Sequence, residues 1–165
     1  MWPQTLPTLE TDRLILRTPN ADDTNDLFAI YGDPEVMQYT DEKPFPSKAT
    51  VAQMLDSVQR LFQAHESLEW AIVHKSTGQV IGTCGLHSFD RRLNKAEVGC
   101  LLRQDHWAQG YMPEALLAVI QYANQQLGVR TLEADVDPEN NRALLLFKRL
   151  RFVVGDGGRL VLTLG

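Results

Sequence analysis

The sequence has few cysteines and no surplus of positive charge. Its two cysteines, Cys84 and Cys100, lie in no CxxC pair or Cys/His cluster, so neither a disulfide framework nor a zinc site is indicated. The four histidines lack the spacing of metal ligands, and we expect no metal. With 21 Asp and Glu against 16 Lys and Arg, the formal net charge is -5, whereas nucleic-acid binding requires clustered cations. We therefore expect no nucleic-acid partner.

Long apolar runs are absent as well. The apolar segments, such as residues 144–147, are far shorter than the roughly 18 to 20 residues that span a bilayer. The beginning, MWPQTLPTLE, lacks the basic start and apolar stretch of a signal peptide. We expect no membrane partner and a cytoplasmic protein. At 165 residues, 44% of them apolar, the chain favours a single domain over residues 1–165.

The spacing of apolar residues changes along the chain between the period of helices and that of strands. The succession of these segments predicts an α/β protein of the mixed α+β kind, with helices packed on a mixed sheet. The predicted helices are residues 21–31, 50–64, 113–126 and 140–150, and the predicted strands are residues 13–17, 69–74, 79–86, 95–102 and 131–136, with a final pair turning at residues 155–158.

The stretch WAQGYMPEAL, residues 107–116, places a glycine just before the most regular helical pattern. Pro113 suits a first helical turn, so we expect the helix to begin at about Met112. Because Gly110 has no side chain, the amides of Gln109, Gly110, Tyr111 and Met112 can converge on an anion at the positive end of the helix. A pyrophosphate is the anion we predict. The alternative is an ordinary strand-to-helix turn, in which glycine serves only the backbone conformation.

Two long segments carry a resemblance to a known family. Residues 96–123, AEVGCLLRQDHWAQGYMPEALLAVIQYA, and residues 135–152, DVDPENNRALLLFKRLRF, resemble the GNAT superfamily of acetyl-CoA-dependent N-acetyltransferases. Residues 9–17, LETDRLILR, and the stretch above are most similar to the Rim-type ribosomal-protein N-terminal acetyltransferases, with Ala108 replacing the first glycine of W-G-x-G-Y-x-x-E-A-L. Of the wider superfamily motif only Gly110 is present, with Trp107 and Met112 at the flanking places.

The resemblance covers nearly the whole chain and implies the GNAT fold. That fold has a central mixed, mostly antiparallel sheet, helices on both faces, and a splayed parallel strand pair, here residues 95–102 and 131–136. The pantetheine arm of the cosubstrate acetyl-CoA would lie between these strands and pair with the backbone of Leu101 and Leu102. An N–H of the same strand would stabilise the oxyanion formed when an amine attacks directly.

Two side chains receive catalytic roles from the resemblance. Glu97 is our candidate base, because many relatives carry a carboxylate on the strand that enters the cleft. Its alternative is a solvent-facing glutamate or an ion pair with Arg91 or Arg92, since strand register is not fixed to one residue. Asn140 matches a family asparagine that contacts the cofactor arm or a water, and it is also a good helix N-cap.

The proton donor for the leaving thiolate departs from the family pattern. Phe147 stands where many relatives have tyrosine, and Ala143 stands where Rim-type proteins often have serine. Water, Tyr111 or Tyr122 would then have to substitute. Because a thiol has a pKa of about 8.5, the thiolate leaves tolerably well without a donor, and we expect slower turnover rather than none.

Three further positions have open interpretations. His87 is a distant alternative base. Cys100 is either a nucleophile for acyl relay or, as its lack of an activating neighbour favours, a small apolar residue. Arg151 replaces a glycine that usually precedes the aromatic Phe152, which concerns only the local turn.

The sequence thus predicts an N-acetyltransferase that acetylates a primary amine in a ternary complex. Rim-type resemblance favours a protein N-terminal α-amine, which costs only about 1 kcal/mol to deprotonate at pH 7, against about 4 to 5 kcal/mol for a lysine amine. A small-molecule amine is the second hypothesis, and a catalytically idle acyl-CoA-binding module is the third. We expect a monomer or a homodimer.

Overall fold

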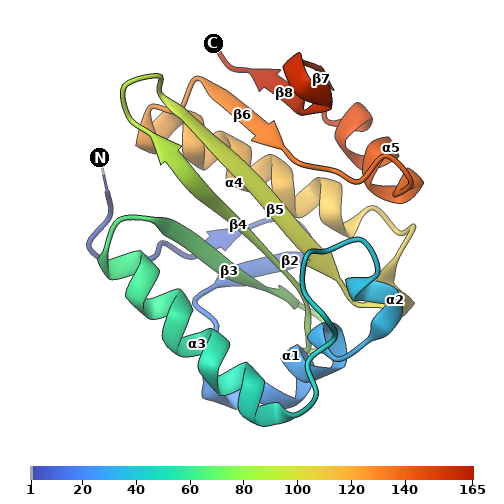
Figure 1. The fold of residues 1–165 in the computed structure, drawn as a ribbon. Helices are drawn as coiled ribbons and strands as arrows, with labels where there is room; N and C mark the ends of the chain where they lie inside the picture. Colours follow the sequence, from blue (N-terminus) through green and yellow to red (C-terminus); the bar gives the residue numbers. More distant parts are fainter. Residues whose placement is uncertain (1) are drawn as a thin grey trace.

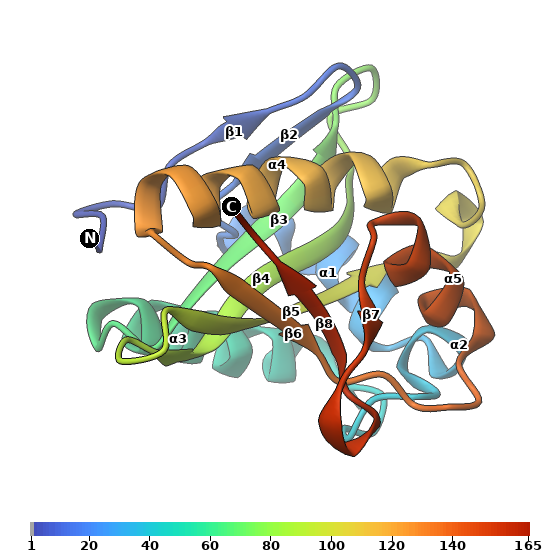
Figure 2. The ribbon, with the colours of Figure 1, turned by 90° about the horizontal axis from the view of Figure 1, so that it is seen from above.

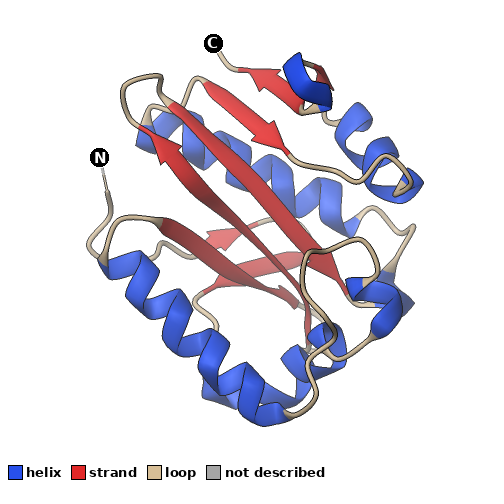
Figure 3. Cartoon of the chain, in the orientation of Figure 1, coloured by secondary structure: helices blue, strands red, loops and turns tan. Residues whose placement is uncertain are grey.

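A computed structural model describes residues 2–165, which form one eight-stranded sheet in the order β1-β2-β3-β4-β5-β6-β8-β7 (Figures 1 and 3). Neighbouring strands are antiparallel except β5 and β6, which are parallel. The predicted mostly antiparallel sheet with one parallel pair is confirmed. The strands are β1 (Leu9–Glu10), β2 (Leu14–Arg17), β3 (Ser67–His74), β4 (Val80–Asp90), β5 (Lys95–Leu102), β6 (Thr131–Ala134), β7 (Val153–Val154) and β8 (Leu160–Thr163).

Within residues 2–165, five α-helices accompany the sheet. The predicted helix over residues 21–31 is divided into a 3-10 turn, Ala21–Asp23, and α1. The division arises because the Asp23 carboxylate accepts hydrogen bonds from the Asn20 N–H and from the Arg17 guanidinium, which fixes a separate capped turn. The helices are α1 (Thr24–Tyr31), α2 (Pro34–Met37), α3 (Lys48–Gln63), α4 (Tyr111–Leu127) and α5 (Asn141–Arg149).

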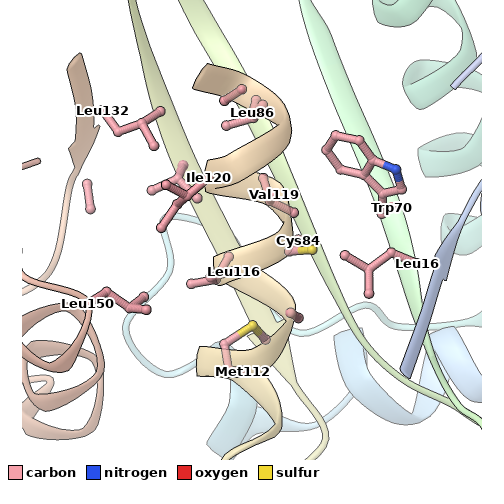
Figure 4. Packing of buried hydrophobic residues seen from close by; sticks show 14 of the residues in the cluster. Leu16, Trp70, Cys84, Leu86, Met112, Leu116, Val119, Ile120, Leu132 and Leu150 are labelled. Carbon is pink, nitrogen blue, oxygen red and sulfur yellow. The ribbon is translucent and has the colours of Figure 1, made fainter. Parts of the chain in front are cut away.

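Helices cover both faces of the sheet, as predicted. Figure 2 shows α4 across one face and α3 beneath the other. Successive strand residues point to opposite faces, so the buried apolar side chains divide into two clusters. On the α4 face, Leu116, Val119 and Ile120 pack with strand residues that include Cys84 and Leu86 (Figure 4). On the other face, residues of α1, α2 and α3 pack on Ala71, Val73 and Val80.

The parallel strands β5 and β6 stay together for only three residue pairs. Lys95, Ala96 and Glu97 lie opposite Thr131, Leu132 and Glu133, respectively. Strand β5 then continues to Leu102, paired with β4 alone, while β6 ends at Ala134, two residues before the predicted end (Figure 1). Residues 98–102 therefore have a backbone edge without a strand partner, where the two strands separate.

The end of α5 explains the departure at Arg151. This residue has a φ of 74°, in the left-handed region that favours glycine. Its N–H donates to the Lys148 carbonyl, and the Phe152 N–H donates to the Phe147 carbonyl, both at 3.0 Å. The rings of Phe147 and Phe152 meet edge to face, with centroids 5.0 Å apart. These contacts form a Schellman C-cap with its hydrophobic contact, and its left-handed position carries arginine instead of glycine.

We expect Arg151→Gly to stabilise the protein by about 1 kcal/mol, because a left-handed conformation is unfavourable for any residue with a Cβ. In thermal unfolding this corresponds to a rise of about 2 to 4 °C in the melting temperature. Arg151→Ala is the matched control, since it removes the side chain but keeps the Cβ. Equal stability of the glycine and alanine variants would contradict the assignment.

Candidate functional site

A cleft of about 1020 Å³ lies at the separation of β5 and β6. Its walls come from Glu97 to Leu102 of β5, from residues 107–108 and 110–113 of the loop and first turn of α4, from residues 134–138 at and after the end of β6, and from one side of α5. Side chains from the other face of the sheet complete the lining, among them Tyr31, Glu69 and Thr83. The cleft thus begins at the sheet surface and continues past the unpaired edge of β5.

The loop before α4 ends in a left-handed glycine. Gly110 has a φ of 81° and is the N-cap, so α4 begins at Tyr111, one residue before the predicted start at about Met112. Pro113 is therefore the third helical residue and not the first; proline is tolerated there because the N–H groups of the first turn have no intrahelical acceptor. Tyr111 and Met112 line the cleft, and because N–H groups at a helix start have no intrahelical acceptor, the anion site stays a prediction for this turn.

The conformation of Ala108 accounts for the glycine that relatives have in its place. Ala108 has a φ of 61°, in the left-handed region. Beside it, the Trp107 indole N–H donates to the Leu102 carbonyl at 2.8 Å, and the Arg142 guanidinium lies 3.3 Å from the Trp107 ring centroid. Trp107 therefore fixes the loop to the end of β5 and to α5.

Arg13 binds the same loop from β2's side of the sheet. Its guanidinium donates to the Gln109 carbonyl at 3.1 Å, lies 4.2 Å from the Tyr111 ring centroid, and pairs with Glu114 at 2.8 Å. Burial of Glu114 opposes ionisation, but hydrogen bonds from Thr11 and Arg13 outweigh it and hold the pKa of that carboxyl below its usual value. In the sequence, LETDRLILR was only part of the resemblance, and it did not indicate that Arg13 contacts the loop before α4.

Glu97 lines the cleft, and its carboxylate accepts a hydrogen bond from Arg159. Arg159 also approaches Glu133 at 3.6 Å, and Glu133 pairs with Lys95 at 3.4 Å. The hydrogen bond that Arg159 donates to the Glu97 carboxylate raises the pKa of the guanidinium above its usual value. An ion pair was one of the two predicted interpretations of Glu97, but the partner is Arg159, 62 residues away, and not Arg91 or Arg92.

Asn140 lines the cleft and caps α5, which begins at Asn141. Its side-chain oxygen accepts from the Ala143 N–H at 3.1 Å. The N-cap interaction predicted for Asn140 is therefore present, and contact with a cofactor remains a prediction. Leu101 and Leu102 also line the cleft and belong to the unpaired part of β5.

The groups considered as proton donors differ in their placement. Phe147 and Ala143 both line the cleft, and Phe147 is only 3% exposed because its other side packs in the core. The Tyr111 hydroxyl is hydrogen-bonded to His74 Nε2 at 2.9 Å. Tyr122 packs edge to face on Trp70 and is not part of the cleft lining. Of the four positions considered, Tyr122 is thus the one that does not line the cleft.

Cys100 and His87 also line the cleft. Burial, reinforced by the charge of Glu69, raises the pKa of the Cys100 thiol to about 12, which keeps it protonated at neutral pH. This favours the apolar interpretation of Cys100 over acyl relay. His87 is exposed, and its Nδ1 lies 3.0 Å from the Ser88 hydroxyl.

One carboxylate of the cleft was missed by the sequence analysis. The pKa of Glu69, on β3, is raised to about 7, because burial disfavours the charged carboxylate more than the Thr83 hydroxyl stabilises it. In the sequence it is only the first residue of an apolar strand, EWAIVH. The remaining lining is more acidic than basic, with Asp41, Glu42, Glu97, Asp135 and Asp137 against Arg142 and Arg149.

Two negative findings concern the described part of the chain. Within residues 2–165, no group of three or more His, Cys, Asp or Glu side chains is arranged to hold a metal ion. No helix in those residues combines the length and the apolar character needed to cross a bilayer.

Comparison with known proteins agrees with this geometry. Residues 13–153 match the model of a family described as acetyltransferase (GNAT) domain. A Bacillus licheniformis protein named uncharacterized N-acetyltransferase p20 is 33% identical over 147 residues, 89% of this chain and 83% of that protein. Mycobacterium smegmatis RimJ in complex with CoA-disulfide superposes with a TM-score of 0.82 at 14% identity, covering 98% of this chain and 88% of that chain. RimL, described as a ribosomal L7/L12 alpha-N-protein acetyltransferase in complex with coenzyme A, gives 0.84 at 14% identity, with 96% and 98% covered.

A sheet that opens at one parallel strand pair, beside the start of a helix capped by glycine, together with the match to the family model, defines an acyltransferase of the GNAT type. The chain belongs to the GNAT acetyltransferase family. The family and fold predicted from the sequence are confirmed, and RimJ and RimL are among the structural neighbours.

Proposed function

We propose that this protein transfers the acetyl group of acetyl-CoA to a primary amine, with a protein N-terminal α-amine as the acceptor. The observation that carries the proposal is the continuity between the unpaired edge of β5 and the amide loop before α4. An extended pantetheine arm fits the first, and a pyrophosphate fits the second. Both belong to the lining of one cleft, and coenzyme A carries both groups in one molecule, a pantetheine arm joined to a pyrophosphate.

The residues that would hold the cosubstrate are those of the loop and the open strand. The proposed contacts are the backbone edge of Leu101 and Leu102, the Asn140 side chain, and the amides of Gly110, Tyr111 and Met112, all from residues that line the cleft. The amide of Gln109, the loop residue before Gly110, is also proposed, although Gln109 is not part of the lining. The fit is supported by Gly110, which lines the cleft and has no side chain to cover the neighbouring amides. The bound thioester supplies an activated acetyl group.

The chain supplies the groups that act on the acetyl transfer. An N–H of the open part of β5 is placed to donate to the carbonyl oxygen as negative charge develops there. A carboxylate of the cleft takes the proton that the attacking amine loses, and Glu97 is the one to which the sequence assigns this role. Asn140 holds the cosubstrate arm or a water beside the reacting atoms.

The acceptor is argued from charge and acidity. Acidic side chains at the cleft, such as Asp41, Glu42 and Asp137, favour a cationic amine. An α-amine loses its proton at neutral pH for only about 1 kcal/mol, which places little demand on the base of the site. RimL, whose description names an α-N-protein acetyltransferase, supports the same acceptor. The acidic lining also fits a small polycation, which is the second candidate.

Both cysteines are free, which suits the reducing cytoplasm.

The test is acetyl-CoA turnover across a panel of N-terminal peptides, polyamines and aminoglycosides. We expect peptides with a free α-amine to be acetylated fastest, and the same peptides with a blocked N-terminus and a free lysine to react slowly. Faster acetylation of the polyamines or aminoglycosides would move the acceptor to a small molecule. Binding of acetyl-CoA with no acetylation of any amine would identify an idle binding module.

A further inference from the structure

Glu69 and two glycines lie opposite one another on three neighbouring strands. On β3, Glu69 is opposite Gly85 of β4, and Gly85 is opposite Gly99 of β5. A Cβ built on Gly85 would lie 2.2 Å from Glu69 Oε2, so the carboxylate occupies the space above that glycine. A Cβ on Gly99 would meet only His87 Nε2, at 3.6 Å. Because neither glycine has a side chain, no side chain from these two positions separates the Glu69 carboxylate from β5.

The carboxylate of Glu69 faces groups from several elements. The hydroxyls of Tyr31 on α1 and Thr83 on β4 are hydrogen-bonded to each other at 2.8 Å and lie beside it. The other ionisable groups around this part of the cleft are Cys84 and His87 on β4, Glu97 and Cys100 on β5, Tyr39, Asp41 and Glu42 before α3, and Arg142 on α5.

Glu69 and Glu97 differ in their partners. Glu97 is bound by Arg159, whereas over residues 2–165 no lysine, arginine or histidine forms an ion pair with Glu69. Burial without a cation raises the pKa of Glu69 to about 7, the range in which a general base works best at neutral pH. A carboxylate bound to arginine must first give up that contact before it can take a proton.

We propose that Glu69, and not Glu97, accepts the proton of the substrate amine, directly or through one water. The inference rests on the proposed acetyl transfer. The amine nitrogen forms a bond to the acetyl carbon, the carbon–sulfur bond breaks, and coenzyme A leaves as the thiolate. The proton lost by nitrogen goes to the Glu69 carboxylate, which later returns it to solvent. Glu97 then keeps β5 joined to the segment before β8 through Arg159.

The experiment compares Glu69→Gln with Glu97→Gln in the full-length protein. Both changes keep the shape of the side chain, and Glu69→Gln removes a charge whose burial is unfavourable, so we expect it to fold. The measurements are kcat over about pH 5.5 to 9 with acetyl-CoA and the best amine of the panel, and the affinity for coenzyme A by calorimetry. The kcat profile reports groups in the ternary complex, where the amine is already bound.

For Glu69→Gln we expect kcat to fall by roughly 10²- to 10³-fold, with the affinity for coenzyme A changed by less than about twofold. The decrease of kcat on the acidic side of the parent profile should disappear in this variant. Glu97→Gln should keep that acidic decrease and lose no more than about fivefold in kcat. Glu69→Asp, which retains a carboxylate on a shorter arm, should recover part of the activity.

Two results would overturn this inference and leave the proposed function intact. An active parent whose rate and pH profile are unchanged by Glu69→Gln would remove Glu69 from the reaction, and loss of the acidic limb only in Glu97→Gln would return the role to Glu97. A parent that binds acetyl-CoA but acetylates no amine would overturn the proposed function and this inference together.

Discussion

Gly110→Glu should weaken coenzyme A binding by at least about 100-fold, equivalent to about 2.7 kcal/mol, in a protein that remains folded. The substitution places a side chain and a negative charge in front of the amides that are proposed to bind the pyrophosphate. It also forces a residue with a Cβ into a φ of 81° beside the Arg13 guanidinium. Calorimetry with coenzyme A measures the loss, and circular dichroism with thermal unfolding shows that the fold persists.

Two matched variants separate the effect of the charge on coenzyme A affinity from the effects of bulk and backbone strain. Gly110→Gln has the same bulk and backbone strain without the charge, so its remaining affinity measures how much of the loss is electrostatic. Ala108→Gly lies in the same loop at a φ of 61° and should keep the affinity while adding roughly 0.5 to 1 kcal/mol of stability. If Gly110→Glu, while folded, bound coenzyme A as tightly as the parent, the loop would not be the pyrophosphate site.

The elements that the sequence predicts best are those with a strong period. The helix predicted at residues 50–64 is α3, Lys48–Gln63, because one side of it is apolar over several turns. Strand β1 and helix α2 were not predicted, since two and four residues are too few to establish a period. A local signal for α2 does exist: Asp33 accepts from the Glu35 N–H, and Pro34 occupies the first turn.

The residues of the candidate site also differ in whether the sequence indicates them. The loop at Gly110 and the departures at Ala108 and Arg151 are visible in the sequence, because each depends on the conformation of a single residue. Glu69 and Arg159 are not visible, because their roles depend on strand register between segments far apart in the chain. A one-residue change in that register would turn Glu69 to the opposite face of the sheet.

The other large effect concerns the missing proton donor. We expect Phe147→Tyr to raise kcat by at least about tenfold, because a positioned general acid typically contributes roughly 10²- to 10⁴-fold to the rate. The ring of Phe147 lines the cleft on α5 and is held from the other side by Phe152, so an added oxygen requires little repacking if it projects into the cleft.

Phe152→Tyr is the control for this prediction. Phe152 packs against the same ring, is 5% exposed and is not part of the cleft lining, so its hydroxyl would enter the core. An unpaired buried hydroxyl costs roughly 1 to 3 kcal/mol, and we expect Phe152→Tyr to lower the melting temperature without any gain in kcat. Phe147→Tyr should lose much less stability, since its oxygen can reach water or bound coenzyme A. If Phe147→Tyr instead lost as much stability as Phe152→Tyr and gained no rate, position 147 would belong to the core alone, and the donor would have to be water.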